Sequence, residues 1–258
     1  MKRPLRIGIV GSNFGVKVLL PAFVATPGCE VVAVCAKPSP TLSAFTKKTG
    51  FSTIYTDWKT MLKETPLDAL AIAVTPSAQA LIAKEAIKKG IHIFGEKPLT
   101  AHTTSAKELL ELAKKHKITH AVDFTFPEIN AWQKAKALIE SGRFGSLQNI
   151  SVNWQWLAGD IKNKITSWKT KVKDGGGILS LYFSHGLYYL EYFAGPIANI
   201  HSLFTHAPES LGGAESGIDL SIVFKNGVTA KAFPIAKPGE MSNFTINGDL
   251  ADITANFN

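Results

Sequence analysis

The chain has 258 residues, of which 45% are hydrophobic and 19% are charged, a composition typical of a globular protein with room for one large domain or two smaller ones. No apolar run approaches the ~18 residues of a membrane span, and the first one is too short for a signal sequence, so we expect a cytoplasmic protein without a membrane partner. The formal charge of +8 comes from lysines that are mostly dispersed over helical patterns, which argues against a nucleic-acid surface.

Short apolar strands alternate with helical patterns in the first half of the chain. Strands are predicted at residues 5–10, 29–34, 67–74, 90–94 and 118–124. The first, third and fourth are apolar throughout, as strands buried on both faces of a parallel sheet tend to be. The β-α-β-α order predicts a doubly wound parallel sheet, which we assign to a first domain, 1–122.

Helix boundaries between these strands carry recognisable signals. Ser39 precedes Pro40, which suits an N-cap and a first helical position, and Asp57 precedes another helical pattern. The remaining signals are a capping box formed by Ser105 and Glu108, and Gly90 at the end of the helix before the fourth strand.

The first strand runs into the segment GSNFGV, residues 11–16, where a doubly wound sheet binds the phosphates of a dinucleotide. Against the pattern G-x-G-x-x-G, Gly11 matches, whereas Asn13 and Val16 replace the second and third glycines and Gly15 is an extra one. Asn tolerates a positive φ, so the turn can still form. A plain strand-to-helix turn is the alternative, but the place of the segment in a β-α-β unit favours a cofactor site. The expected contacts are Gly11, Ser12, Asn13, Phe14 and Gly15.

The end of the second strand bears on the choice of cofactor. An acid there binds the ribose 2′-hydroxyl of NAD, but this chain has Ala36 and Lys37. A lysine complements the 2′-phosphate of NADP, so both residues are assigned to the cofactor site and NADP is favoured, with NAD as the alternative. The other interpretation of Lys37 is an ordinary loop lysine.

The fourth predicted strand is followed by Glu96, Lys97 and Pro98. This strand ends at the same carboxyl edge as the glycine segment, so Lys97 is expected to project toward the bound cofactor. Pro98 favours an extended backbone at Lys97. A lysine beside a reacting hydroxyl stabilises developing alkoxide charge or exchanges a proton with it. The alternative is a surface pair of Glu96 and Lys97.

Five lysines lie in the acid-free stretch 162–173, just before a glycine triplet. Two interpretations stay open for this segment, a mobile flap that attracts phosphate and a solvated loop.

Several segments in a fixed order resemble the Gfo/Idh/MocA oxidoreductases. They are the glycine segment, LDALAIAVTP, EAIKKGIHIFGEKPL, ALIESGRFGSLQNI and GGGILSLYFSHGLYYLEYFAGP. The resemblance implies a Rossmann domain followed, over 123–258, by an α/β domain with an open, mostly antiparallel sheet that shapes the substrate pocket and pairs in homo-oligomers. It also implies sugar, polyol or small carbonyl substrates and a cis peptide before the proline of the EKP tripeptide. Relatives usually continue for several tens of residues after a segment like the last one here. Either the sequence given leaves out part of the chain, or the second domain is shortened and its sheet is smaller than usual.

The resemblance also assigns residues. Lys97 polarises the reacting oxygen, His185 is the general acid or base, and Thr75, Pro76 and Glu96 contact the cofactor; no metal site is implied. A histidine suits the proton transfer because it titrates near neutrality, although a buried structural histidine is the alternative. Many relatives have aspartates four residues before and three residues after this histidine, where the chain has Leu181 and Tyr188, and a histidine near Gln79. Tyr182 is a candidate substitute for the missing acid.

Two functions follow from these patterns. The first is an NAD(P)-dependent oxidoreductase that transfers a hydride between nicotinamide and its substrate. The second is a non-catalytic dinucleotide-binding sensor or partner subunit, suggested by the departures at Asn13, Val16, Leu181 and Tyr188.

Overall fold

In the computed structural model the chain divides into two units, Met1–Asp123 and Phe124–Asn258, within one residue of the boundary expected from the sequence. The structure describes residues 3–165, 167–209 and 212–257. Over these residues, no helix has both the length and the apolar character needed to cross a bilayer.

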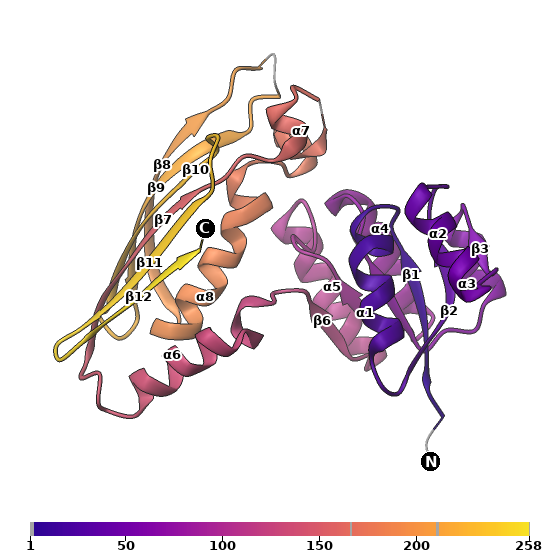
Figure 1. Cartoon of the computed structure of the whole chain (residues 1–258), viewed down its shortest axis with the longest axis horizontal. Coiled ribbons are helices and arrows are strands. Elements are labelled where there is room, and N and C mark those ends of the chain that lie inside the picture. Colours follow the sequence, from indigo (N-terminus) through magenta and orange to yellow (C-terminus); the bar gives the residue numbers. More distant parts are fainter. Residues whose placement is uncertain (1–2, 166, 210–211, 258) are drawn as a thin grey trace. The chain divides into compact units, whose positions relative to one another are not determined.

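The first unit is a doubly wound sheet of six parallel strands in the order β3-β2-β1-β4-β5-β6, as the alternation of elements predicted (Figure 1). The strands are β1 (Leu5–Val10), β2 (Cys29–Cys35), β3 (Ile54–Tyr55), β4 (Ala69–Ile72), β5 (His92–Gly95) and β6 (His120–Val122). The helices are α1 (Leu20–Ala25), preceded by a π-helical segment (Gly15–Leu19), α2 (Pro40–Thr49), α3 (Trp58–Glu64), α4 (Pro76–Lys88) and α5 (Thr103–His116). The sequence did not predict β3, because two residues are too few for a periodic pattern.

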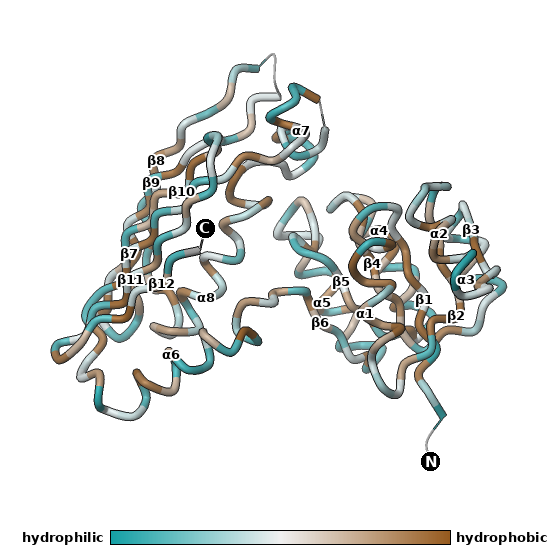
Figure 2. Tube along the Cα trace, viewed as in Figure 1, coloured by the Kyte–Doolittle hydropathy of each residue, from teal (hydrophilic) through white to brown (hydrophobic). Residues whose placement is uncertain are grey.

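Each face of this sheet carries its own apolar core. Alternate residues of one strand enter different cores: Ile9 packs with Leu20 on one side, whereas Val10 packs with Ile82 on the other. Figure 2 shows the apolar strands β1 and β4 among helices whose surfaces include hydrophilic stretches. Full burial of such a side chain contributes about 1.5–3 kcal/mol, so burial on both faces fixes the register of the central strands.

The expected helix starts at Ser39 and Asp57 are confirmed. The Ser39 hydroxyl accepts a hydrogen bond from Leu42 N at 3.2 Å, and the Asp57 carboxylate accepts one from Thr60 N at 2.9 Å. Gly90 has a φ of +75°, as expected after a helix. The capping box at Ser105 is wrong: α5 begins two residues earlier, so Ser105 already lies within the first turn.

The second unit contains a six-stranded sheet in the order β12-β11-β7-β10-β9-β8. Only the pair β10–β7 is parallel among the strands described, which confirms a mostly antiparallel sheet. The strands are β7 (Leu147–Gln155), β8 (Ile197–His206), β9 (Glu215–Phe224), β10 (Thr229–Ile235), β11 (Met241–Gly248) and β12 (Asp252–Phe257). The helices are α6 (Asn130–Glu140), α7 (Gly159–Lys162) and α8 (Ser184–Ala194), preceded by a π-helical segment (Leu179–Phe183), with short 3₁₀ turns at Phe126–Glu128, Trp168–Thr170 and Val172–Asp174.

Helices α6 and α8 cover one face of this second sheet with an aromatic core (Figure 1). Trp132 of α6 stacks on Tyr189 of α8 with ring centroids 5.1 Å apart, and both rings meet Phe244 of β11 edge-on. The buried positions of Tyr189 and Phe193 agree with the expectation that most of the aromatic run 182–193 is core. This packing fixes α8, and therefore the position of His185 near its start.

Candidate active site

The glycine segment after β1 forms a tight turn that requires glycine at its first position. Gly11 has a φ of +146°, and a Cβ there would lie 2.3 Å from the carbonyl oxygen of Ala73. Asn13 does not adopt the positive φ that the sequence suggested; its carbonyl accepts a hydrogen bond from Lys17 N at 2.8 Å and so begins the helical segment. Gly15 and Val16 are both buried, and Val16 belongs to the core. The side chain at position 16 thus serves helix packing.

These residues fit a dinucleotide phosphate. No side chain caps the N-terminus of the helical segment that starts at Gly15. Asn13 and Phe14 are exposed there, and Ser12 is half-buried. Backbone N–H groups at a helix start, together with the positive end of the helix dipole, favour an anion.

The end of β2 is tied to this turn. Lys37 N donates a hydrogen bond to the Ser12 hydroxyl at 2.8 Å, and Gly11 N donates one to the Cys35 carbonyl at 3.0 Å. Lys37 is exposed, whereas Ala36 is 5% exposed and packs in the core. A cation is therefore present at the strand end from which an acid is missing.

The side chain of Gln79, on α4, hydrogen-bonds the backbone of the Glu96-Lys97-Pro98 turn. The Gln79 side chain is fully buried, and its Nε2 donates to the carbonyl oxygens of Glu96 at 2.5 Å, Pro98 at 3.2 Å and Leu99 at 3.1 Å. The Lys97–Pro98 peptide is cis, as the family resemblance implied. In the sequence, Gln79 was noted only because it stands near the position where many relatives have a histidine. Its structural role is to fix the backbone that carries Lys97.

Thr75 and Pro76 lie at the start of α4, the helix that carries Gln79. Thr75 is the N-cap residue of α4, and its carbonyl accepts a hydrogen bond from Gln79 N at 2.8 Å. Pro76 occupies the first helical position, where its missing N–H costs nothing.

Two carboxyl groups meet beside Lys97, and the sequence argument missed one of them. Asp123 follows β6, its N–H donates to the Gly95 carbonyl at 2.9 Å, and its side chain hydrogen-bonds Glu96. Burial raises the pKa of Glu96 to about 8, and the hydrogen bond and charge of Asp123 act in the same direction. At neutral pH the pair therefore holds one proton. The position of Asp123 at the carboxyl end of the strand next to β5 was the signal that would have found it.

His185 lies near the start of α8 among aromatic rings. Its imidazole is 5.5 Å from the ring of Phe124 and 5.0 Å from that of Phe126, and its Nδ1 is buried. Leu181 is 8% exposed, whereas Tyr188 is 45% exposed and stacks on Phe124. Aromatic and aliphatic side chains thus occupy the places where the resemblance implies aspartates.

Lys97 belongs to the first unit and His185 to the second. That their side chains converge on one nicotinamide ring stays a prediction.

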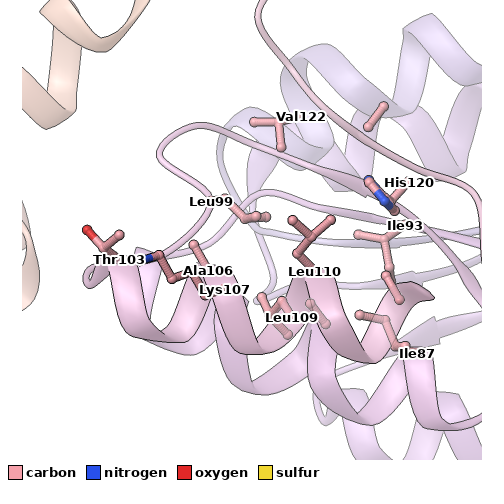
Figure 3. Close-up of a pocket in the computed structure, with 13 residues that line it drawn as sticks. Ile87, Ile93, Leu99, Thr103, Ala106, Lys107, Leu109, Leu110, His120 and Val122 are labelled. Atoms are coloured by element: carbon pink, nitrogen blue, oxygen red, sulfur yellow. The ribbon is translucent and has the colours of Figure 1, made fainter. Parts of the chain in front are cut away.

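A separate apolar cavity of about 340 Å³ lies in the first unit, between α4, α5 and strands β5 and β6 (Figure 3). Ile93, Leu99 and Leu110 form much of its wall, and Lys107 and His120 are its charged or titratable members. Glu96, Lys97 and Gln79 do not line it. The cavity therefore lacks the polar groups of the candidate site. Across the described residues, no cluster of three or more His, Cys, Asp or Glu side chains is arranged to hold a metal.

A doubly wound dinucleotide-binding unit, followed by an α/β unit that presents a histidine on a helix beside an open sheet, defines a class of two-domain nicotinamide-dependent proteins. The family model described as "Oxidoreductase family, NAD-binding Rossmann fold" matches residues 5–124, and that of the GFO/IDH/MocA C-terminal domain matches residues 132–254. The chain belongs to the Gfo/Idh/MocA oxidoreductase family.

Two curated relatives match most of this chain. An oxidoreductase of Synechocystis sp. is 28% identical over 211 residues, which are 80% of this chain and 57% of the relative. Levoglucosan dehydrogenase of Pseudarthrobacter phenanthrenivorans is 28% identical over 227 residues, 82% of this chain and 58% of that enzyme. The chain thus spans a little over half the length of these two curated relatives.

Among solved structures, the WlbA dehydrogenase of Bordetella pertussis, in complex with NADH and UDP-GlcNAcA, superposes with a TM-score of 0.89 at 21% identity. The match covers all of this chain and 74% of that one. At this identity the likeness concerns the fold.

Proposed function

We propose that this chain is an NAD(P)-dependent oxidoreductase that transfers a hydride between nicotinamide and a sugar-like, polyol or small carbonyl substrate. The observation that carries the proposal is the Glu96-Lys97-Pro98 turn, fixed by Gln79 at the carboxyl edge of the sheet. Family membership and the dehydrogenase named among the relatives support the same activity.

In this proposal separate residues bind the cofactor, stabilise charge on the substrate and transfer the proton. The glycine segment and the helix start behind it bind the phosphates, and Thr75, Pro76 and Glu96 border the nicotinamide half. When bound, the cofactor supplies or accepts the hydride. The Lys97 ammonium hydrogen-bonds the substrate oxygen and stabilises negative charge on it. His185 gives or takes the proton of that oxygen, and the rings of Phe124 and Phe126 keep water from one side of its imidazole.

The test is a Lys97→Ala substitution, assayed with a panel of sugars, polyols and carbonyls by nicotinamide absorbance. We expect the variant to lose at least ~100-fold in kcat/KM while it binds the cofactor as tightly as the parent chain, because Lys97 acts on the reacting oxygen. Equal turnover by both proteins would contradict the proposal.

NADP is the proposed cofactor form, with NAD as the alternative. Lys37 is exposed at the end of β2 and is held by Ser12, so its ammonium is available to a 2′-phosphate. In a fluorescence titration NADPH should bind more tightly than NADH, and equal dissociation constants would remove this preference.

A non-catalytic dinucleotide sensor is the second candidate. It is favoured by Leu181 and Tyr188, which occupy the two positions at which the resemblance implies aspartates. A sensor should bind NADPH, but it should not oxidise NADPH in the presence of any compound of the substrate panel.

We also propose a homo-oligomer built through the open face of the second sheet. Asn153, Asn243 and Asn256 form a row on this face, where Asn243 donates to Asn256 at 2.6 Å, and Phe233 is 42% exposed beside them. Light scattering should report a dimer or larger species that Phe233→Lys dissociates.

A further inference from the structure

The backbone N–H of Lys97 is held by a side chain rather than by the sheet. Gln79 binds carbonyl oxygens of the turn, because its Nε2 can only donate. The Lys97 N–H donates instead to Glu96 Oε2 at 3.1 Å. The N–H of Glu96 donates to the Ile72 carbonyl at 2.9 Å, which anchors this residue to the end of β4. The backbone at Lys97 therefore depends on the orientation of the Glu96 carboxyl.

Asp123 orients that carboxyl from a different strand. It directly follows β6, and its N–H donates to the Gly95 carbonyl at 2.9 Å, so its backbone is fixed at the edge of the sheet that bears the turn. Its side chain hydrogen-bonds the side chain of Glu96. A protonated carboxyl has one O–H donor and keeps its capacity to accept. Protonated Glu96 can therefore donate to Asp123 and accept from Lys97 N at the same time.

This arrangement needs the proton on Glu96. Burial, together with the hydrogen bond and charge of Asp123, raises the pKa of Glu96 to about 8. The ammonium and the N–H of Lys97, on the same turn, act in the opposite direction and are outweighed, and Gln79, which reaches the turn from α4, is neutral. Once the proton is lost, both carboxyl groups are acceptors only, so they repel each other and their hydrogen bond is lost. Ionised Glu96 is then driven away from Asp123, and the acceptor of the Lys97 N–H moves with it.

We infer that Asp123 is a positioning residue for the reaction, which holds the Lys97 turn in place through the proton that it shares with Glu96. The inference deepens the proposed function, and it rests on that function for turnover. It adds an alkaline limit to the same site, because the turn is held while the pair keeps its proton and is released when the proton leaves. A misplaced catalytic group costs up to ~100-fold in rate, so release of the turn should be measurable in kcat.

The first measurement is kcat and KM of the full chain from pH 6 to pH 9.5, with NADPH and a compound of the substrate panel. Asp123→Asn keeps the hydrogen bond at every pH, because a carboxamide donates to ionised Glu96. The ratio of kcat in Asp123→Asn to kcat in the parent chain should therefore rise about fivefold between pH 7 and pH 9.5. Titration of His185 affects both proteins alike and cancels in this ratio.

Two further variants complete this series. Asp123→Ala should lose about tenfold in kcat at pH 7 with KM for NADPH unchanged, because Glu96 has lost its partner. Asp123→Asn keeps the shape of the side chain and carries the test if Asp123→Ala does not fold. Glu64→Gln, at an exposed carboxyl of the same unit, is the control and should keep the pH profile of the parent chain.

A second measurement needs no turnover. Hydrogen exchange of the Lys97 N–H, followed by NMR at pH 7 and pH 9, is expressed as protection relative to an unstructured chain at the same pH. Protection should fall about tenfold in the parent chain and stay within about twofold in Asp123→Asn.

A kcat ratio that is constant with pH would overturn the inference, and so would Lys97 protection that is the same at both pH values in the parent chain. A Glu64→Gln profile like that of Asp123→Asn would also overturn it. Loss of Lys97 protection in a parent chain that turns over no compound would contradict the oxidoreductase and leave the role of Asp123 in the turn established. Turnover with a constant ratio and constant protection would support the oxidoreductase and exclude Asp123 as its positioning residue.

Discussion

The carboxyl pair of Glu96 and Asp123 makes the pH dependence of stability predictable. Glu96 has a pKa of about 8 in the folded chain, against 4.5 for an unperturbed side chain. Between these pH values the unfolded chain has lost a proton that the folded chain retains, so stability falls as the pH rises from 4.5 to 8. Below pH 4.5 Glu96 is protonated in both states, so its ionisation does not lower the free energy of unfolding. Above pH 8 Glu96 is ionised in both states, and the loss of stability is complete.

The perturbation is Glu96→Gln, which removes the titration while its amide still donates to Asp123 and its oxygen still accepts from Lys97 N. A pKa rise from 4.5 to about 8 corresponds to about 5 kcal/mol. Because the carboxyl is partly open to solvent, screening lowers this to roughly 2 kcal/mol. We therefore expect the variant to be more stable than the parent chain by roughly 2 kcal/mol at pH 8 and equally stable at pH 4.5.

The assay is hydrogen exchange of segments 92–97 and 120–123 at pH 5 and pH 8, because it reports on these strands even when the two units unfold separately. Asp123→Asn should give part of the increase in stability at pH 8, because it removes the charge of Asp123 but leaves Glu96 buried. Glu64→Gln, at an exposed glutamate of the same unit, is the control and should show no such pH dependence. Protection that is the same in Glu96→Gln and the parent chain at pH 8 would refute the shared proton.

Three further outcomes are expected. Gln79→Leu should lower the unfolding free energy by about 2–3 kcal/mol, because three partly buried carbonyl oxygens lose their donor, and urea denaturation measures the loss. Gly11→Ala should abolish NADPH binding in a fluorescence titration, since its Cβ would meet the Ala73 carbonyl, whereas Gly28→Ala, with open space around it at a φ of +81°, should cost about 1 kcal/mol and leave binding intact. Lys37→Ala should bring the dissociation constants of NADPH and NADH within about twofold of each other. If the variant still prefers NADPH as strongly as the parent chain, another residue recognises the 2′-phosphate.

Local signals in the sequence located most of the first unit. The apolar strands and the caps at Ser39 and Asp57 depend on residues close together in the chain, which is why patterns predicted them. The capping box at Ser105 failed because α5 begins at Thr103 without a side-chain cap at His102, so Ser105 and Glu108 both lie inside the helix. In the glycine segment the positive φ expected at Asn13 is absent, because its carbonyl already starts the helix.

By itself the sequence determined the α/β architecture, the family and the placement of Lys97 at the carboxyl edge of a parallel sheet, since these depend on periodicity and on short contiguous motifs. Only the tertiary structure decided what surrounds Lys97. Gln79 and Asp123 reach the turn from other elements, 17 or more residues away in the chain, and no local pattern encodes a hydrogen bond to a carbonyl or a shared proton.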